Sequence, residues 1–342
     1  MPSVSIKDIA RTAGVSHSTV SRTLSSSPLV KPETKARIQR LAGEMGYSPD
    51  ARARSLVKGQ TRTVGVVVTT ILDPFVAEVV QAIESTAHDH DYTVILSSSS
   101  GEPEREIAAV EMLRSKRVDA VIVTSSRVGA LYLEYLERIG VPIVLINNHS
   151  QNSGRYTYSI SVDNQHGGYL ATTHLTQLGH RCIAYVSRPS DYRSNQERMA
   201  GYCQALTEAA IPFEPVLVVS STGRAEGGEE ALRALLALEE RPTAVFCYND
   251  MTAVGLLRAA REVGLIVPQD LAVVGFDDVL LASYVCPPLT TIAQPKIGMG
   301  QQAFQMALAL MTATDPTHEG FSDITVRGQL VVRESSRMRT QG

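Results

Sequence analysis

The chain has 342 residues, more than the roughly 250 to 300 at which a single hydrophobic core stops growing, so we expect at least two folded units. Hydrophobic residues make up 44% and charged residues 20%, a globular composition that argues against extensive disorder. The net charge of −3 hides an asymmetry, because residues 1–60 carry ten Lys/Arg against four Asp/Glu whereas the remainder carries 22 against 31. A basic head is typical of nucleic-acid binders, although a solvated surface can have the same balance by chance.

The cysteines and the hydropathy pattern argue against several other classes of protein. Cys182, Cys203, Cys247 and Cys286 lie far apart without a CxxC or CxxH pair, which predicts neither a zinc site nor a disulfide framework. The first ten residues lack the apolar segment of a signal peptide, and no run of 18 apolar residues occurs. We therefore expect a cytoplasmic protein that is neither exported nor membrane-spanning.

Three short helices are predicted in the first 47 residues. The segment Ser5–Asp8 has the form of a capping box, and Gly14 ends the helix that follows it. Ser16 can cap a second helix, on which Val20 and Leu24 face inward, so the spacing is that of a helix-turn-helix. A third helix follows Pro32, ends at Gly46 and has an apolar stripe: Ile38, Leu41, Ala42 and Met45. By itself this pattern also fits any small helical bundle.

Longer motifs decide between these interpretations. The segment "IKDIARTAGVSHSTVSRTLSSSPLVKPETKARIQRLAGEMGYSPDARARSL" closely resembles the DNA-binding head of the lactose-repressor (LacI/GalR) family, particularly in "DIAxxAGVSxxTVSRxL" and "GYxPxxxARxL". The resemblance continues through "RVDAVIV", "LGHRCIAYV", "RMAGY", "VFCYND", "VPQDLAVVGFDD", "PPLTTI" and "VVRESS". Because it covers nearly the whole chain, the protein is identified as a member of this family.

The resemblance implies that the second helix lies in the major groove of DNA. It places His17, Ser18 and Arg22 at the base-reading positions. Arg22 is chemically the strongest candidate, because its guanidinium can bond guanine O6 and N7 together. His17 and Ser18 can reach either base edges or phosphates. Three further residues are expected to cap the helix or contact phosphates: Ser16, Thr19 and Ser21.

A charged joint follows the head at residues 48–61. Ser48 can cap a helix that starts at Pro49, but the stretch before Gly59 is too short for a helix that is stable alone, so the pattern itself favours a flexible linker. In the family this segment is a hinge helix that forms on the operator, and the leucine matching Leu56 wedges into the minor groove. Many relatives have Asn where this chain has Asp50, which leaves that contact open. The resemblance assigns hinge contacts with DNA to Arg52, Ala53, Arg54 and Leu56.

Strands and helices alternate through the remainder of the chain. Strand-like runs occur at Val64–Val68, Thr93–Leu96, Ala120–Val123, Ile143–Ile146, Cys182–Val186, Val216–Val219, Ala244–Tyr248 and Leu271–Phe276. Helical patterns lie at Pro74–Ala87, Glu104–Arg114, Gln165–Leu178, Gln196–Ala210 and Met251–Glu262. Such alternation predicts doubly wound parallel sheets. The expected fold class is an all-α helix-turn-helix head joined to an α/β body, which has two parallel-sheet subdomains of periplasmic-binding-protein type.

The expected domains are a head at 1–47, a hinge helix and linker at 48–61, and an effector-binding and dimerisation body at 62–342. Resemblance to the family and to periplasmic sugar-binding proteins implies crossings between two subdomains near Ser159–Val162, Thr290–Ala293 and Asp323–Gly328. The first subdomain would then comprise about 62–160 plus 293–323, and the second about 161–292 plus 324–342.

Polar loops mark the expected effector site, because ligands of open α/β sheets bind outside the carboxyl ends of the strands. The loops "TTILDPF", "TSS" and "NNHS" make Asp73, Phe75, Ser126 and Asn147 candidates. Asp73 before Pro74 fits an ordinary helix N-cap equally well, and Phe75 fits a core residue. Four further positions match residues that line the effector pocket in the family: Arg198, Asn249, Asp277 and Gln294.

Two other classes of protein were weighed against a regulator. "STGRAEGG" lacks the GK[ST] of a P-loop, no GxGxxG follows the first strand, and no GxSxG or HExxH occurs, so we predict no catalytic site, metal site or cofactor. A transport-type sugar-binding protein would need a signal peptide and no basic head. The sequence fits neither class.

We therefore predict a transcriptional repressor that binds a pseudo-palindromic operator as a homodimer under the control of a small-molecule effector. A sugar or sugar derivative is the favoured effector, since Arg and Asp can each hold two neighbouring hydroxyls. The chain has no Trp and only 5% aromatic residues, which weighs against a stacked purine. A purine or nucleoside stays open as the alternative because of Phe75 and Tyr248.

Overall fold

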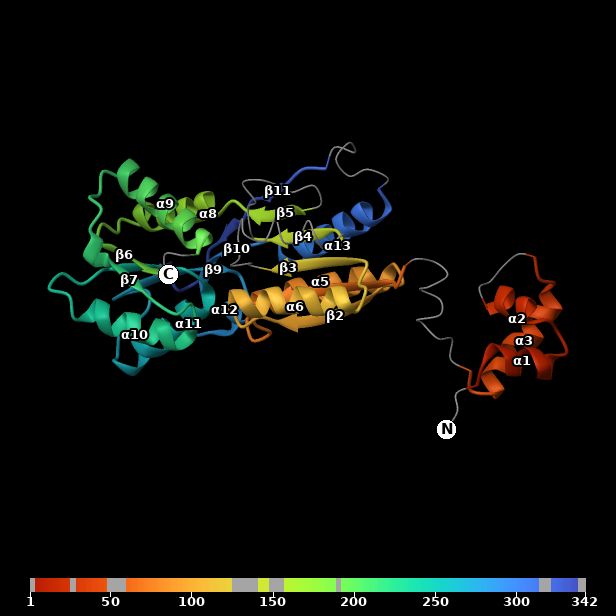
Figure 1. Ribbon diagram of the computed structural model, residues 1–342. Helices are drawn as coiled ribbons and strands as arrows, with labels where there is room; N and C mark the ends of the chain where they lie inside the picture. Colours follow the sequence, from red (N-terminus) through yellow and green to blue (C-terminus); the bar gives the residue numbers. More distant parts are fainter. Residues whose placement is uncertain are drawn as a thin grey trace. The chain divides into compact units, whose positions relative to one another are not determined.

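A computed structural model describes residues 4–24, 29–47, 60–124, 141–147, 157–188, 192–313 and 321–337. The chain divides into two compact units, the head Met1–Thr61 and the body Arg62–Gly342 (Figure 1).

The head is a three-helix unit with a small apolar core. Its helices are α1 (Ile6–Ala13), α2 (His17–Leu24) and α3 (Pro32–Glu44). The predicted capping box is confirmed, because the Asp8 amide donates to Ser5 Oγ and the Ser5 amide donates to the Asp8 carboxylate. Gly14 ends α1 with a left-handed φ of 65°. The core consists of Ile9, Ala10, Ala13, Val20, Ile38 and Ala42, with Leu41 and Met45 packed against it.

The body contains two six-stranded sheets among its described residues. The first sheet has the order β11-β5-β4-β3-β1-β2 and consists of β1 (Thr63–Val68), β2 (Thr93–Ser98), β3 (Ala120–Thr124), β4 (Ile143–Ile146), β5 (Thr157–Val162) and β11 (Ile324–Val326). The second has the order β12-β10-β9-β8-β6-β7 and consists of β6 (Ile183–Ser187), β7 (Val218–Ser220), β8 (Ala244–Cys247), β9 (Ala272–Asp277), β10 (Thr290–Ala293) and β12 (Gln329–Val331). All these pairings are parallel except that of β10 with β12.

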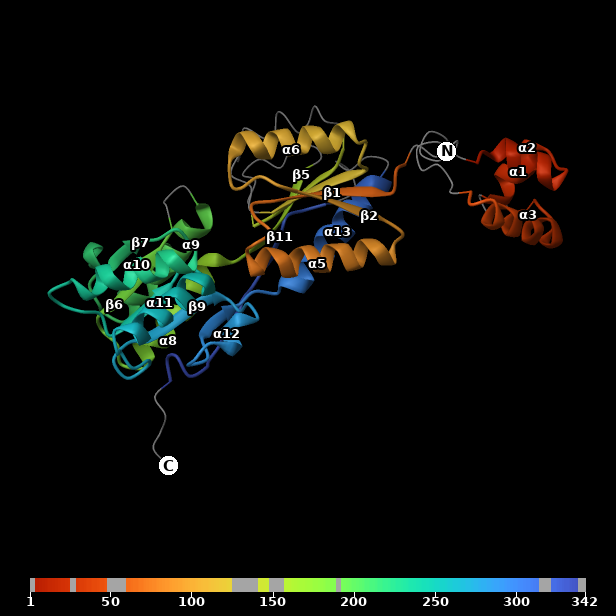
Figure 2. The same ribbon diagram turned by 90° about the horizontal axis from the view of Figure 1, so that it is seen from below.

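Helices cover both faces of each sheet. The first sheet lies between α6 (Pro103–Ser115) on one face and the pair α5 (Pro74–Asp89) and α13 (Lys296–Thr312) on the other, as Figure 2 shows. On the second sheet α8 (Asn164–Gln177) packs against α9 (Arg193–Glu208), and α10 (Ala225–Leu236) packs against α11 (Asp250–Glu262). A short 3-10 helix, η1 (Pro215–Leu217), precedes β7, and α12 (Leu281–Tyr284) follows β9.

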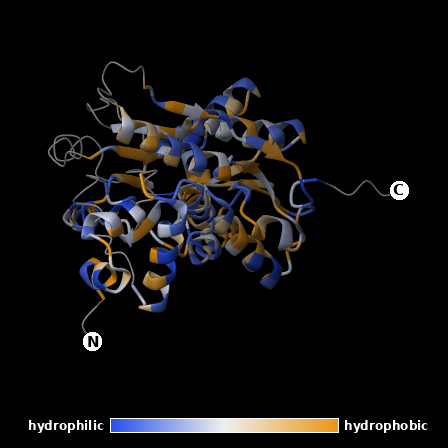
Figure 3. Ribbon diagram, turned by 90° about the vertical axis from the view of Figure 1, so that its right-hand side faces the viewer, coloured by the Kyte–Doolittle hydropathy of each residue, from blue (hydrophilic) through white to orange (hydrophobic). Residues whose placement is uncertain are grey.

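Burial on both faces explains the apolar strands of the body. Strands β3, β4, β6 and β8 are buried at every residue, as expected of parallel strands with helices above and below. Figure 3 accordingly shows hydrophobic colours along the strands and mixed colours along the helices. The predicted fold class, a helical head with two parallel-sheet α/β subdomains, is confirmed.

The chain crosses between the two sheets three times, after β5, after β10 and between β11 and β12. Strand β11 pairs with β5 through Ile324–Val326 and therefore belongs to the first sheet. The third crossing thus lies at Arg327 and Gly328, three residues beyond the expected boundary at 323. Helix α13 lies in the first subdomain, where it packs against α5.

Among the described helices, the short α12 and two long helices, α10 and α13, have no counterpart among the predicted patterns. The sequence "STGRAEGG", considered only as a phosphate loop, leads into α10, and α13 has apolar residues on nearly all sides and hence no clear stripe. Within the described ranges, no helix combines the length and hydrophobicity that crossing a membrane requires.

Candidate DNA-binding face and effector pocket

Helix α2 presents polar side chains on the face opposite its core contacts. Val20 and Thr23 are buried, whereas His17, Ser18 and Arg22 are exposed. The predicted base-reading residues therefore lie on one accessible face of the second helix.

Ser16 has a structural role at the start of α2. Its Oγ accepts a hydrogen bond from the Thr19 amide at 3.1 Å, which is the N-cap interaction that the sequence predicts. The same oxygen lies 2.8 Å from Ser18 Oγ and 2.8 Å from Thr19 Oγ1. Ser21 is exposed. The expected phosphate contacts of Ser16, Thr19 and Ser21 stay predictions.

Several predicted contacts lie outside the described residues. They comprise the hinge positions Arg52, Ala53, Arg54 and Leu56, and the effector candidate Ser126. Their assigned roles stay predictions.

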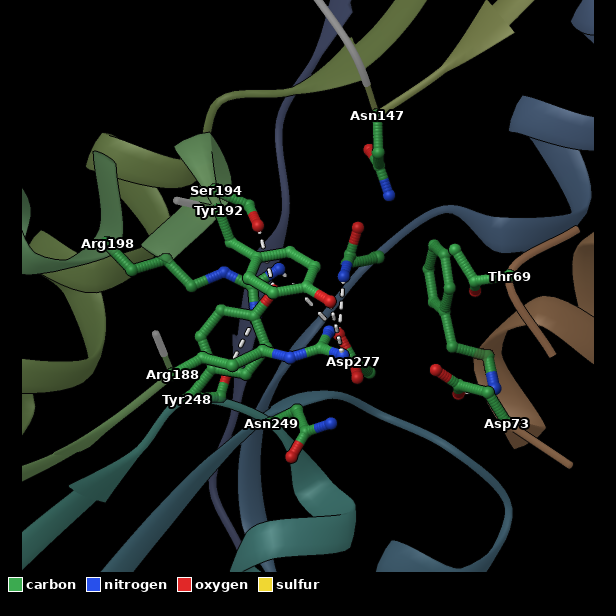
Figure 4. Close-up of a pocket in the computed structure, with 12 residues that line it drawn as sticks. Thr69, Asp73, Asn147, Arg188, Tyr192, Ser194, Arg198, Tyr248, Asn249 and Asp277 are labelled. Atoms are coloured by element: carbon green, nitrogen blue, oxygen red, sulfur yellow. Dashed lines mark hydrogen bonds and ion pairs between the residues drawn. The ribbon is translucent and has the colours of Figure 1, made fainter. Parts of the chain in front are cut away.

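A pocket that is partly open to solvent lies between the two subdomains of the body (Figure 4). The first subdomain contributes Thr69, Asp73, Phe75 and Asn147, and Gln294 follows the second crossing. The second subdomain contributes Arg188, Tyr192, Ser194, Arg198, Tyr248, Asn249 and Asp277. Every described residue of the predicted effector site therefore lines this one pocket.

Arg198 is a buried side chain of the pocket that is held by hydrogen bonds and ring contacts. It is 4% exposed, and its Nε donates to Asn164 Oδ1 at 3.0 Å while its Nη1 donates to the Tyr248 carbonyl. Its guanidinium carbon lies 3.6 Å from the centre of the Phe276 ring. Gly168 of α8 lets α9 approach closely, since a Cβ there would collide with the Arg198 carbonyl. The packing of α8 on α9 thus fixes this arginine at the pocket wall.

Asp277 ends β9 with a left-handed φ of 119° and is 6% exposed. Its Oδ1 accepts a hydrogen bond from Gln294 Nε2 and lies 4.0 Å from Arg198 Nη2. Burial raises the pKa of Asp277 well above its usual value, and the nearby Arg198 charge only partly opposes this effect. The carboxyl group therefore accepts a proton more readily than an exposed aspartate.

Asn249 has all its amide atoms committed to the fold. It N-caps α11, because its Oδ1 accepts from the Thr252 amide at 3.0 Å, and its Nδ2 donates to the Gly223 carbonyl at 3.0 Å. The resemblance assigns this position to ligand binding. In this chain the side chain lines the pocket and also holds the turn before α10 in place.

In the pocket wall that the first subdomain supplies, fewer polar atoms are already hydrogen-bonded within the protein. Asp73 N-caps α5 through the Phe75 amide at 3.0 Å, which confirms the N-cap interpretation. It also lines the pocket, and its contact with an effector stays a prediction. Phe75 is 6% exposed, a core residue that also reaches the pocket. Asn147 Oδ1 and Gln294 Oε1 are buried without a hydrogen-bond partner. Two acceptors are therefore available to donors of a ligand.

The pattern analysis missed Thr69, Arg188, Tyr192 and Ser194, and it considered Tyr248 only as an aromatic side chain. Arg188 directly follows β6, at the carboxyl end of a parallel strand. The rule that identified the other loops applies equally to this one. Tyr192 and Ser194 lie at the start of α9, where no motif marks them.

A buried polar cluster supports the pocket from behind. The Asp250 carboxylate accepts hydrogen bonds from the Val279 amide at 2.9 Å and from Thr291 Oγ1. Lys296, at the start of α13, donates to the Asp277 carbonyl at 2.9 Å and forms an ion pair of 3.4 Å with Glu78 of α5. This lysine links the effector side of β9 to the first subdomain.

Comparison with known proteins identifies the family. Residues 5–50 match the bacterial regulatory proteins of the lacI family, and residues 172–336 match a periplasmic binding protein-like domain. The HTH-type transcriptional repressor PurR of Edwardsiella ictaluri (strain 93-146) is 39% identical over 332 residues, which is 96% of each chain. The chain belongs to the LacI/GalR family of transcriptional regulators. The repressor of the same name from Vibrio atlanticus (strain LGP32) is 37% identical over 92% of this chain and 93% of its own.

Solved structures of other LacI-family proteins share the architecture. The lac repressor dimer bound to operator and the anti-inducer ONPF has a TM-score of 0.88 at 28% identity and covers 98% of this chain and 99% of its own. The regulator CelR in complex with cellobiose has a TM-score of 0.73 at 29% identity and covers 97% and 100%. This LacI-family member is therefore a DNA-binding transcriptional repressor, as the sequence predicts.

Proposed function

We propose that this LacI-family repressor binds a pseudo-palindromic operator as a two-fold dimer and that a purine-type effector in the pocket sets its operator affinity. The exposed face of α2 supports the DNA-binding part. A dimer would present two such helices, and two-fold protein symmetry matches a palindromic site. Arg22 would read a base, while the other polar residues of α2 would position the helix.

Exposed apolar residues support the dimer. Leu72 is 83% exposed in the loop before α5, and Leu280 and Tyr284 at α12 are 69% and 76% exposed. Large apolar side chains in such positions mark interaction surfaces when they gather. The solved lac repressor relative is itself a dimer. Sedimentation of the Tyr284→Glu variant tests this surface: dissociation supports the proposal, and an unchanged mass contradicts it.

The observation that carries the effector class is the set of planar side chains in the pocket. Phe75 lines it from the first subdomain. Tyr192 and Tyr248 line it from the second (Figure 4). Aromatic rings pack against planar ligands such as a purine base. The PurR relatives, 34% to 39% identical over at least 92% of this chain, favour the same class. The prediction that a sugar is the preferred effector is therefore less favoured.

A sugar is the second candidate, and a specific observation favours it. The unpartnered oxygens of Asn147 and Gln294 and the carboxyl of Asp277 can accept hydrogen bonds from hydroxyl groups. The CelR relative was solved with cellobiose. The same acceptors can bond the ring N–H or amino groups of a purine, so it is the aromatic rings that favour a purine over a sugar.

Calorimetry with matched ligand panels tests the effector class. Purine bases, nucleosides and nucleotides form one panel, and mono- and disaccharides form the other. We expect saturable binding of at least one purine compound, which is lost in Arg198→Ala and retained in the exposed-site control Arg193→Ala. Binding of a saccharide alone would replace the purine proposal by the second candidate.

A further inference from the structure

The pocket contains two arginines whose surroundings differ. Arg198 is 4% exposed and donates hydrogen bonds to the Asn164 side chain and to the Tyr248 carbonyl. Arg188 is half-buried, and the one side-chain hydrogen bond that its guanidinium makes among the described residues goes to the Tyr192 hydroxyl at 3.2 Å. Because a guanidinium has five N–H donors, most of those of Arg188 are available to a ligand.

The Arg188 side chain is held in place from two sides. Its guanidinium carbon lies 3.9 Å from the centre of the Tyr192 ring. On the other side it runs along Gly223, where a Cβ would meet Arg188 Nε at 3.1 Å and where φ is a left-handed 75°. Asn249 fixes this turn through the Gly223 carbonyl. The Arg188 charge is thus presented to the pocket in a defined position.

The positive charge of Arg188 has no direct counter-ion among the described residues. Arg198 lies near Asp277, but no described carboxylate forms an ion pair with Arg188. Burial raises the pKa of Asp73, and the Arg188 charge acts on this carboxyl in the opposite direction without forming an ion pair with it. A partly desolvated guanidinium without a counter-ion binds an anion favourably.

We propose that Arg188 is an anion-binding residue of the effector site and that the effector is a phosphorylated purine, a nucleoside monophosphate, rather than a free base. This inference rests on the proposed purine-type function and adds that the ligand carries a phosphate group. The guanidinium fork matches two phosphate oxygens. The base then lies among Phe75, Tyr192 and Tyr248, and the phosphate lies against Arg188.

Calorimetry on the full-length protein tests the contribution of the ligand's phosphate separately from that of its base. The ligands are guanosine, adenosine and inosine, each with and without a 5′-phosphate, together with ribose and ribose 5-phosphate. For the wild type, at least one monophosphate is expected to bind about 10- to 100-fold more tightly than its nucleoside. In Arg188→Gln this difference between the two ligands is expected to disappear while nucleoside binding persists.

Arg193→Gln is the matched control, because it removes the same charge from an exposed residue of α9 that pairs with Glu197. It is expected to keep the preference for phosphate, and thermal unfolding checks that each variant is folded. Equal binding of nucleoside and monophosphate by the wild type, or the same loss for both ligands in Arg188→Gln, overturns the proposal. Binding of ribose 5-phosphate in an Arg188-dependent manner, with no purine bound, would refute the purine function and keep the anion site. Binding of no phosphorylated ligand overturns the anion site.

Discussion

The exposed face of α2 and the effector pocket use polar side chains in opposite ways. On α2, His17, Ser18 and Arg22 point to solvent from a helix whose core contacts come from other residues. In the pocket, Arg198 and Asp277 are buried and held by hydrogen bonds that also join helices and strands. Substitution of these exposed α2 residues should therefore change DNA binding without changing stability, whereas substitution of the buried pocket residues should change stability as well as ligand binding.

The strongest test of this difference is Arg198→Ala. The change removes the bonds to Asn164 and the Tyr248 carbonyl and leaves Asp277 buried without its cationic neighbour. We expect a loss of about 3 to 5 kcal/mol in the free energy of unfolding, measured with urea. Arg193→Ala, which breaks only an exposed pair with Glu197, should cost less than about 1 kcal/mol. Equal losses in the two variants would contradict the distinction.

The second test uses pH, because burial raises the pKa of Asp250 to about 7. An unfolded chain releases this proton near its ordinary pKa of 3.8, so between these values the folded state binds more protons. Stability from this group is therefore full at low pH and falls as pH rises from about 4 to 7. Asp250→Asn cannot ionise, so its deficit relative to wild type should shrink by roughly 3 kcal/mol between pH 5 and pH 8, because the loss is about 1.4 kcal/mol for each pH unit between pH 5 and the folded pKa of about 7. A deficit that is the same at both pH values would refute the assignment.

A third variant, Arg22→Ala, tests the exposed face of α2. Loss of a forked contact to guanine should weaken operator binding by roughly 1 to 3 kcal/mol and relax specificity at one position. Unfolding should be unchanged, since Arg22 is exposed. Fluorescence anisotropy on a library of operator variants measures both effects. Arg40→Ala on α3, also exposed, serves as the charge-matched control. Uniform weakening across all sequences would instead make Arg22 a phosphate contact.

The smallest expected effect sharpens the comparison inside α2 itself. Ser16 directly precedes α2 and caps its first turn, so Ser16→Ala should destabilise α2 by about 1 kcal/mol. Ser18→Ala should not, because the one hydrogen bond described for its hydroxyl goes to Ser16 Oγ. Amide hydrogen exchange of α2 in the full-length protein measures the difference. Equal protection in the two variants would show that the cap is unimportant.

Local patterns predicted the elements because local physics sets them. The capping box at Ser5 and Asp8, the left-handed glycine after α1 and the buried parallel strands each depend on neighbouring residues. Helix α13 was not predicted because it is apolar on nearly every side, so the sequence shows no separate apolar face with helical spacing. Pattern finds amphipathic helices more readily than buried ones.

Two features of the pocket could not be predicted from the sequence: the gathering of its aromatic rings and the difference between its two arginines. An aromatic content of 5% argued against a purine, but that number counts rings and does not locate them. Folding brings Phe75, Tyr192 and Tyr248 to one cavity from three separate segments. Among the described residues Arg188 differs from Arg198 in that its guanidinium makes fewer hydrogen bonds and no ion pair, a property that only the three-dimensional contacts reveal.

The central claim is that a purine-type ligand in the pocket controls binding at α2. Operator affinity measured with and without the saturating purine compound tests it most directly. Coupling between the two sites should change the affinity of the wild type by about 5- to 150-fold, whereas Arg198→Ala should show the same operator affinity with and without ligand. A wild-type affinity that is unchanged by every purine compound that binds the pocket would contradict the account.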